Sequence, residues 1–353
     1  MSNFPLAYKL TWLPRLLKPS LAGDPRGFAP PAASWLDPTP AQTARLVFIG
    51  DISAVASRTP PVIHPLLRTL LASADLVVGN CESPVVERAR APLGTALGLR
   101  HAMSERFLAN ALEAAGIARD GLVLSVANNH ALDQGVEGFG ETLAALRRLA
   151  IRTVGLAEEP SAKVVVEATS KSALTIDLMA FTQWRNVNRE AFAGRVAMLD
   201  DRVARHGGYD ACDLVCALPH WDREFRHFPM AETRALARKL ADAGVGLVAG
   251  GHAHVVQPFE RLDGTLVAYG LGDFLGTVLA RQPWPGRIGA MLAVDVSLDR
   301  STRGKVAGYE THFFFRERNG GRESLVPVGA LQGPVRDKVL ARLVAIYGPA
   351  VTT

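Results

Sequence analysis

Five apolar segments of this chain each end in a polar residue of a type that binds metal ions. The end residues are carboxylates, carboxamides or imidazoles, and the segments are 45–51, 74–82, 121–130, 214–220 and 245–254. Core packing normally places apolar residues at strand ends, so packing does not explain this recurrence. In open α/β sheets the ligand crevice lies outside the carboxyl ends of the strands. The pattern predicts an α/β protein in which these five ends meet at one rim.

Segments with helical periodicity separate the apolar segments and support this fold class. The clearest are 64–73, 104–116, 136–150 and 230–244. In the second of them, Ser104 is placed as an N-cap and Gly116 as a stop signal. From residue 264 onward the chain is strand-like until a closing helix at 334–348. Strands that alternate with helices, followed by a run of strands, predict a mixed sheet or two stacked sheets.

The last of the five apolar segments ends in Gly250-Gly251-His252-Ala253-His254. On an extended chain, residues two apart point to the same face, so His252 and His254 would present adjacent imidazoles. The two glycines allow the backbone to bend sharply and approach other groups closely. One such pair alone is more often two hydrogen-bonded core histidines. The other four segment ends favour a metal site, because carboxylate, amide and imidazole together suit Mn, Fe or Zn.

Composition and charge narrow the class of protein. The 353 residues are 48% hydrophobic and 21% charged, which excludes a disordered or fibrous chain. A net charge of +5 favours an anionic small molecule or polymer as substrate. The sequence lacks the clustered basic stripe that is typical of a nucleic-acid binder. The three cysteines form no disulfide framework and agree with a reducing, cytoplasmic environment.

The first 44 residues are rich in proline, and we expect them to form an irregular extension before a single domain at 45–353. Pro5, Pro14 and Pro19 are expected to interrupt any long helix. No segment has the length of a membrane span or the pattern of a secretory signal. Residues 1–19 mix large apolar residues with lysine and arginine, so a peripheral contact with the inner face of the membrane is a second expectation. An arm that packs on its own domain or on a partner subunit is favoured.

Six motifs occur in an order that resembles the CapA family, which is named for poly-γ-glutamate capsule biosynthesis and belongs to the calcineurin-like metallophosphoesterase superfamily. ANNHALDQG and GHAHVVQ are the most specific of them. The motifs are GD at 50–51, ADLVVGNCESP at 74–84, SVANNHALDQGVEG at 125–138, HWDRE at 220–224, GHAHVVQP at 251–258 and YGLGDF at 269–274. The resemblance implies a four-layer α/β/β/α sandwich of two mixed sheets with one or two divalent metal ions, such as manganese, at the strand ends.

The resemblance also implies six metal ligands and a catalytic pair. The ligands are Asp51, Glu82, Asn129, His220, His252 and His254. Asp51 and His254 would bind the first metal, and Glu82 would bridge the two ions. Asn129, His220 and His252 would bind the second. His130 would protonate the leaving group and Asp133 would orient it, while Glu224 would lie at the margin of the site.

Some positions depart from the family pattern or carry no motif. Ser53 stands where most metallophosphoesterases have a histidine, so the first metal would lose an imidazole. Asp222 and Asp273 stand where the family usually has Gly and Asn, and both would add negative charge near an anion site. Asn128 is interpreted as structural. The remaining histidines are interpreted as ordinary surface or half-buried residues; they are His64, His101, His206, His227 and His312.

These features predict a metal-dependent hydrolase that cleaves a phosphoester of an anionic substrate with a metal-bound hydroxide. A different class of function stays open at this point. The chain would then be an accessory factor, or an amide-bond enzyme, in the synthesis of a capsule or a poly-γ-glutamate-type polymer. A nuclease is a third interpretation, and the lack of a concentrated basic patch speaks against it.

Overall fold

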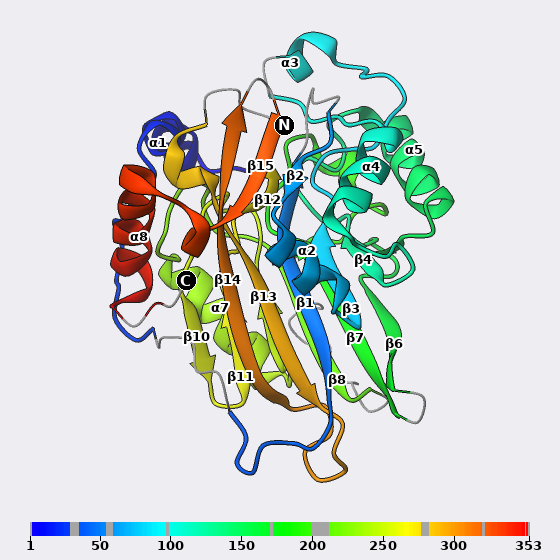
Figure 1. Cartoon of the computed structure of the whole chain (residues 1–353). Helices are drawn as coiled ribbons and strands as arrows, with labels where there is room; N and C mark the ends of the chain where they lie inside the picture. The colour runs from blue at the N-terminus through cyan, green and yellow to red at the C-terminus, as the bar shows by residue number, and fades with distance from the viewer. Residues whose placement is uncertain are drawn as a thin grey trace.

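Two mixed β-sheets lie face to face in the computed structural model (Figure 1). The structure describes residues 2–28, 35–53, 59–96, 99–169, 172–199, 212–276, 282–319, 322–349 and 351. The first sheet runs in the order β2 (Val62–Ile63), β15 (Arg322–Pro327), β14 (Val306–Asn319), β13 (Ile288–Ser297), β1 (Thr43–Ser53), β3 (Leu76–Asn80), β4 (Leu122–Ser125), β5 (Arg152–Val154), and β12 (Asp273–Gly276) also pairs with β1. The second runs β10 (Phe259–Leu262), β11 (Thr265–Ala268), β9 (Leu247–Ala249), β8 (Leu214–His220), β7 (Ser172–Thr182), β6 (Ser161–Thr169).

Helices cover the outer faces of both sheets. Figure 1 shows α2 (Pro65–Ala72), α4 (Glu105–Ala115) and α5 (Gly135–Arg148) over the first sheet, and α7 (Ala231–Asp242) over the second. The other helices are α1 (Leu6–Leu17), α3 (Pro92–Ala96), α6 (Arg189–Phe192), α8 (Gly333–Tyr347) and the short 3₁₀ turns η2 (Trp284–Arg287) and η3 (Val328–Ala330). The layer order is helix, sheet, sheet, helix, which confirms the expected α/β/β/α sandwich.

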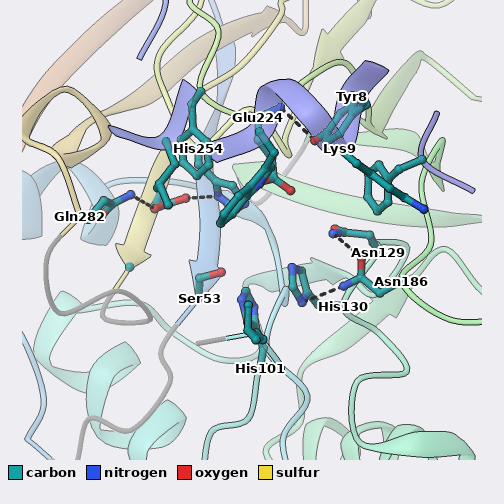
Figure 2. A pocket seen from close by; sticks show the side chains of 17 residues that line it. Tyr8, Lys9, Ser53, His101, Asn129, His130, Asn186, Glu224, His254 and Gln282 are labelled. Carbon is teal, nitrogen blue, oxygen red and sulfur yellow. Dashed lines mark hydrogen bonds and ion pairs between the residues drawn. The ribbon is translucent and has the colours of Figure 1, made fainter. Parts of the chain in front are cut away.

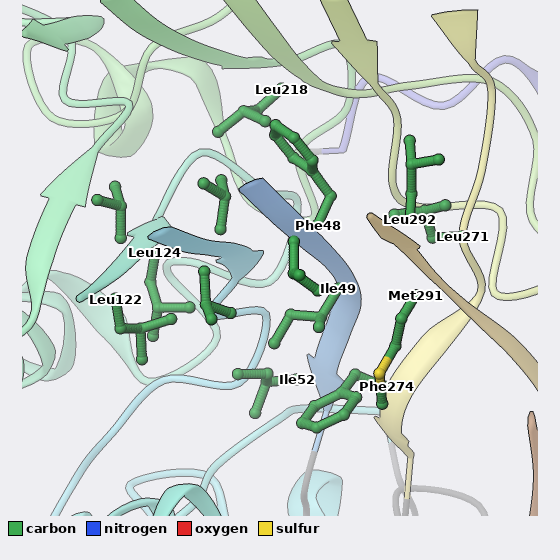
Figure 3. Close-up of a cluster of buried hydrophobic side chains, with 14 of the residues drawn as sticks. Phe48, Ile49, Ile52, Leu122, Leu124, Leu218, Leu271, Phe274, Met291 and Leu292 are labelled. Atoms are coloured by element: carbon green, nitrogen blue, oxygen red, sulfur yellow. The ribbon is translucent and has the colours of Figure 1, made fainter. Parts of the chain in front are cut away.

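Alternation along β7 shows why the second sheet is buried on both faces. Ile176 and Leu178 pack in the core between the sheets, whereas Met179 and Phe181 pack in a separate cluster that includes Leu240 of α7. Successive side chains of a strand point to opposite faces, so one strand serves both layers. Figure 3 shows the inner core, where Leu218 of β8 and Phe48 of β1 belong to the same apolar cluster.

The structure confirms the predicted start and end of α4 and the predicted closing helix. The Ser104 hydroxyl accepts a hydrogen bond from Phe107 N at 3.1 Å and caps α4, which ends at Gly116 with a φ of 73°. The closing helix is present as α8. His206 lies outside the described residues.

The extension is partly regular, which corrects the expectation for residues 6–17. These residues form α1 although Pro14 lies inside the helix. Pro5 precedes the first turn, where its missing N–H costs nothing, and Pro14 falls in the last turns. Contacts with the domain hold the helix: Arg15 Nε donates to Glu224 O at 2.9 Å. The expected packing of the arm on its own domain is confirmed.

A search of the described residues finds no helix with the length and hydrophobicity of a membrane span. The peripheral membrane contact of residues 1–19 stays a prediction.

Candidate metal centre

The structure brings all six predicted ligand side chains to one place at the carboxyl ends of the strands. His220 Nε2 lies 2.8 Å from Asn129 Oδ1 and 3.6 Å from Glu82 Oε1. His254 lies 3.4 Å from the same Glu82 oxygen through Nε2 and 3.6 Å from Asp51 Oδ2 through Nδ1. The ring of His252 lies 4.8 Å from that of His220. Every one of the six side chains is buried.

The backbone at the two histidines differs from the extended geometry expected of them. His252 and His254 have φ angles of 83° and 51°, in the left-handed region, and both follow the end of β9. Their rings reach the centre because the chain coils there, and not because a strand alternates. Gly250 is required for this path: a Cβ there would meet Tyr269 O at 2.1 Å and Trp221 Nε1 at 2.4 Å.

Two buried atoms of the cluster lack a hydrogen-bond partner, and this is the observation that fits a cation. They are Glu82 Oε1 and His252 Nδ1. Buried polar atoms are almost always paired, so each requires an explanation. The ligand atoms of Glu82, His220 and His252 lie within 4.8 Å of one another, as do those of Asp51, Glu82, His254 and Asp273. Two groups that share Glu82 suit divalent ions with a bridging carboxylate.

Burial sets the protonation of these groups. It raises the pKa of Glu82 to about 8 and raises the pKa of Asp51 above its usual value. Burial also holds the pKa of His220 and His252 well below the usual range, so both imidazoles are neutral, which is the form that binds a cation. For His254 burial acts in the same direction, but the carboxylates of Glu82 and Asp273 outweigh it and raise its pKa.

The raised pKa of Glu82 predicts how metal affinity depends on pH. Below about pH 8 the carboxyl holds a proton that a cation must displace, so affinity should rise as the pH approaches 8. Each displaced proton contributes about a tenfold rise per pH unit. Titration calorimetry with Mn²⁺ in buffers of different protonation enthalpy would measure this release. An affinity that stays constant from acidic to neutral pH would contradict it.

Asp273 and Arg316 form a second layer behind His254. Asp273 Oδ1 lies 2.7 Å from His254 Nδ1, and Arg316 Nη2 donates to Asp273 Oδ2 at 2.9 Å. Arg316 is fully buried and also donates through Nη1 to Glu323 Oε1 at 3.1 Å. Arg316 pairs with Asp273 and also with Glu323, so the negative charge expected at Asp273 is present and is only partly compensated. Sequence reasoning missed Arg316, which lies in a strand-like segment without a motif.

The predicted catalytic pair is in contact. His130 Nδ1 lies 2.5 Å from Asp133 Oδ2, and the same oxygen accepts from His101 N at 2.7 Å. Burial alone lowers the pKa of His130, but the Asp133 carboxylate outweighs it and raises that pKa above the usual value. Asn128 has the structural role expected of it, because its amide donates to Cys81 O at 2.9 Å and its carbonyl accepts from His130 N at 3.1 Å.

His101 is a component of the site, so its interpretation as an ordinary residue is wrong. Its ring stacks on His130 with centroids 3.5 Å apart and planes at 4°. It is buried, its Nδ1 has no hydrogen-bond partner, and burial lowers its pKa. No local signal marks it in the sequence, because a backbone hydrogen bond to Asp133 across 32 positions places it.

Three further polar residues differ from their expected places. Ser53 donates its hydroxyl to Glu82 Oε2, so the position of the missing histidine contacts the carboxylate of Glu82. Glu224 lies closer than the margin, with Oε1 3.9 Å from His252 Nε2. Asp222 does not face the ligands as expected: its carboxylate accepts from Gln257 Nε2 at 3.0 Å, and burial raises its pKa to about 6.

A cavity of about 570 Å³ opens onto the centre, and α1 forms part of its wall. Figure 2 shows Tyr8 and Lys9 of α1 beside Glu224 and His254, with His101 and His130 across the cavity. The Tyr8 hydroxyl lies 3.0 Å from His252 Nε2 and accepts from Glu224 N at 3.2 Å. Partners of this kind on the free nitrogen of a ligand histidine fix the orientation of the ring.

Comparisons with known proteins agree with these motifs. A family described as "Bacterial capsule synthesis protein PGA_cap" matches residues 45–277, more than half of the chain, and leaves α1 outside. "PGA biosynthesis protein CapA" of Bacillus subtilis is 28% identical over 246 residues, covering 65% of this chain and 62% of that protein. "Capsule biosynthesis protein CapA" of Bacillus anthracis is 26% identical over 214 residues, covering 58% and 51%. The chain thus spans less than two thirds of the length of these relatives.

One solved structure with similarity to this chain is a 5'-nucleotidase from Candida albicans. It has 12% sequence identity and a TM-score of 0.43, and the match covers 81% of this chain and 52% of that one.

Proposed function

This chain belongs to the PGA_cap family of bacterial capsule synthesis proteins, and from that premise we propose that it is a metal-dependent hydrolase that cleaves a phosphoester of an anionic substrate. The observation that carries the proposal is the pair of unpartnered buried atoms, Glu82 Oε1 and His252 Nδ1, inside a cluster of neutral imidazoles and carboxylates. The ligand atoms of Glu82 and His252 also lie within 4.8 Å of that of His220, so one divalent ion could be bound by all three residues.

The donor set is of the kind that Mn, Fe or Zn takes. Asp51, His254 and Glu82 would hold one ion, and Glu82, Asn129, His220 and His252 the other. When bound, such ions acidify water and polarise a phosphoryl oxygen. Ser53 and Asn80 keep the two carboxylates in place: the hydroxyl of Ser53 bonds Glu82, and Asn80 Nδ2 donates to Asp51 Oδ1 at 2.7 Å.

The reaction adds water across the P–O bond of the ester. A water oxygen becomes bonded to phosphorus, the bond to the leaving oxygen breaks, and that oxygen takes a proton. His130 lines the cavity and is held by Asp133 with a raised pKa, so it can carry this proton near neutral pH. Asn186 Nδ2, 3.3 Å from Asp133 Oδ1, helps to fix the carboxylate.

The role of His130 predicts a dependence on the leaving group. His130→Ala should lower kcat about 10²–10⁴-fold for an alkyl ester, whose alkoxide needs a proton. The loss should be much smaller for a p-nitrophenyl ester, which leaves without one. Metal content, measured by elemental analysis, should not change, because His130 is not among the six proposed ligands and its Nδ1 contacts Asp133 Oδ2. Equal losses for both leaving groups would contradict the acid role.

A second function is favoured by the names of the relatives, which include a "Probable polyglutamine synthesis accessory protein" of Mycobacterium tuberculosis. In this alternative the chain binds a polymer, or acts on its amide bonds, and hydrolyses no phosphoester. Elemental analysis of the purified protein together with a phosphodiester assay separates the two. Stoichiometric metal with turnover supports the hydrolase. Metal-free protein that binds poly-γ-glutamate and hydrolyses no ester supports the accessory role.

A further inference from the structure

One wall of the cavity is built from residues that precede the family-matched region. Phe4, Tyr8, Trp12 and Leu16 recur every fourth residue, which places them along one side of α1 and its entry. All four line the cavity. The rest of the lining includes side chains of the proposed site, among them His130 and His254. The cavity therefore joins a polar floor to an aromatic and aliphatic wall that the family region does not supply.

The wall is a fixed part of the site. Tyr8 contacts His252 at 3.0 Å, and the indole of Trp12 donates to Glu224. Phe4 stacks on Trp184 with ring centroids 5.0 Å apart, and Asn3 Nδ2 donates to Gln183 O at 2.8 Å just before it. These contacts lie along residues 3–12, so α1 cannot move away from the cavity without breaking them.

The chemistry of the wall restricts what it can bind. Among the described residues that line the cavity, Lys9 has the single ammonium group, and it is exposed on α1. A γ-glutamyl polymer would bring a carboxylate in each unit against Phe4, Trp12 and Leu16, where nothing pairs with it. An uncharged apolar group would instead be buried there favourably. The volume of about 570 Å³ is that of a pocket for one small molecule.

We propose that this cavity binds a phosphoester with one apolar arm, an acyl or aryl group, whose phosphoryl group meets the strand ends while the arm lies on α1. The placement of the phosphoryl group rests on the proposed function. The arm subsite is specified by residues 4–16, so it is a property of this chain beyond the matched region.

Ligand binding without turnover tests the proposal. Octylphosphonate and methylphosphonate share a head group that is not hydrolysed and differ only in the arm. Calorimetry on the Mn²⁺-loaded full chain should show octylphosphonate binding at least about tenfold more tightly. Phe4→Ala should reduce this preference at least about fivefold. Leu10→Ala is the control within α1, because Leu10 is 70% exposed and does not line the cavity.

The outcomes separate this proposal from the proposed function. Equal affinities for the two phosphonates, a preference that survives Phe4→Ala unchanged, or tighter binding of a γ-glutamyl oligomer would each overturn the arm subsite. A clear octyl preference that depends on Phe4, in a protein that hydrolyses no phosphoester, would leave the subsite standing and remove the hydrolase. If Phe4→Ala does not fold, Leu16→Ala probes the same wall, with circular dichroism to verify its fold.

Discussion

Replacing His252 with alanine is expected to remove most of the bound metal and to lower phosphoester hydrolysis at least about a thousandfold. His252 is fully buried, and its Nδ1 has no protein partner, so the imidazole is placed for a cation and not for packing alone. Losing a ligand removes several kcal/mol of charge stabilisation, and each 1.36 kcal/mol is about a factor of ten in rate. Elemental analysis and steady-state kcat on the same preparation measure both effects.

His227 offers a matched control for this experiment. Like His252 it is fully buried, with one ring nitrogen bonded (Nδ1 to Val256 O at 2.9 Å) and the other without a partner, but it belongs to none of the ligand groups. His227→Gln should therefore keep its metal and its turnover. A His252→Ala protein with full metal content and activity would exclude the assignment of the centre. Equal losses in both variants would indicate unfolding instead of ligand removal.

The sequence predicts the rim of the site because that information is local. Each ligand directly follows an apolar run, as His220 follows Leu214–Pro219 within β8, and the carboxyl ends of neighbouring parallel strands must meet. The structure shows two buried faces for β7, but the local patterns alone leave open a mixed sheet or two stacked sheets, and it is the family resemblance that implies the layer order. The apolar runs thus predict which strand ends carry ligand-type residues, and the resemblance of the motifs to the CapA family selects the six side chains among them.

What the sequence could not supply depends on contacts between distant segments. His101 stacks on His130 because its backbone bonds Asp133, and Arg316 reaches Asp273 from a strand 43 positions later. The helical state of residues 6–17 depends on Tyr8 and Arg15 finding His252 and Glu224, contacts that outweigh the cost of an internal proline. The local helix or strand preference of a segment does not depend on such distant partners, so it cannot predict them.

The buried arginine carries the largest expected effect on stability. Arg316→Met should lower the free energy of unfolding by about 3–5 kcal/mol, because it leaves the carboxylates of Asp273 and Glu323 buried without a cation. Removing one of these charges should relieve part of the loss. We therefore expect Arg316→Met with Asp273→Asn to be more stable than Arg316→Met alone, with a coupling of about 0.5–3 kcal/mol. Urea unfolding of the metal-free proteins gives these values.

The control is an arginine whose ion pair lies at the surface. Arg148 Nη2 bonds Glu105 at 2.6 Å, but its side chain is 61% exposed. Arg148→Met should change the free energy of unfolding by less than about 1 kcal/mol, since water solvates the carboxylate that remains. If Arg316→Met were as mild, Asp273 would not depend on the arginine for its charge. The negative charge of Asp273 would then have to be balanced by His254, whose Nδ1 lies 2.7 Å from Asp273 Oδ1.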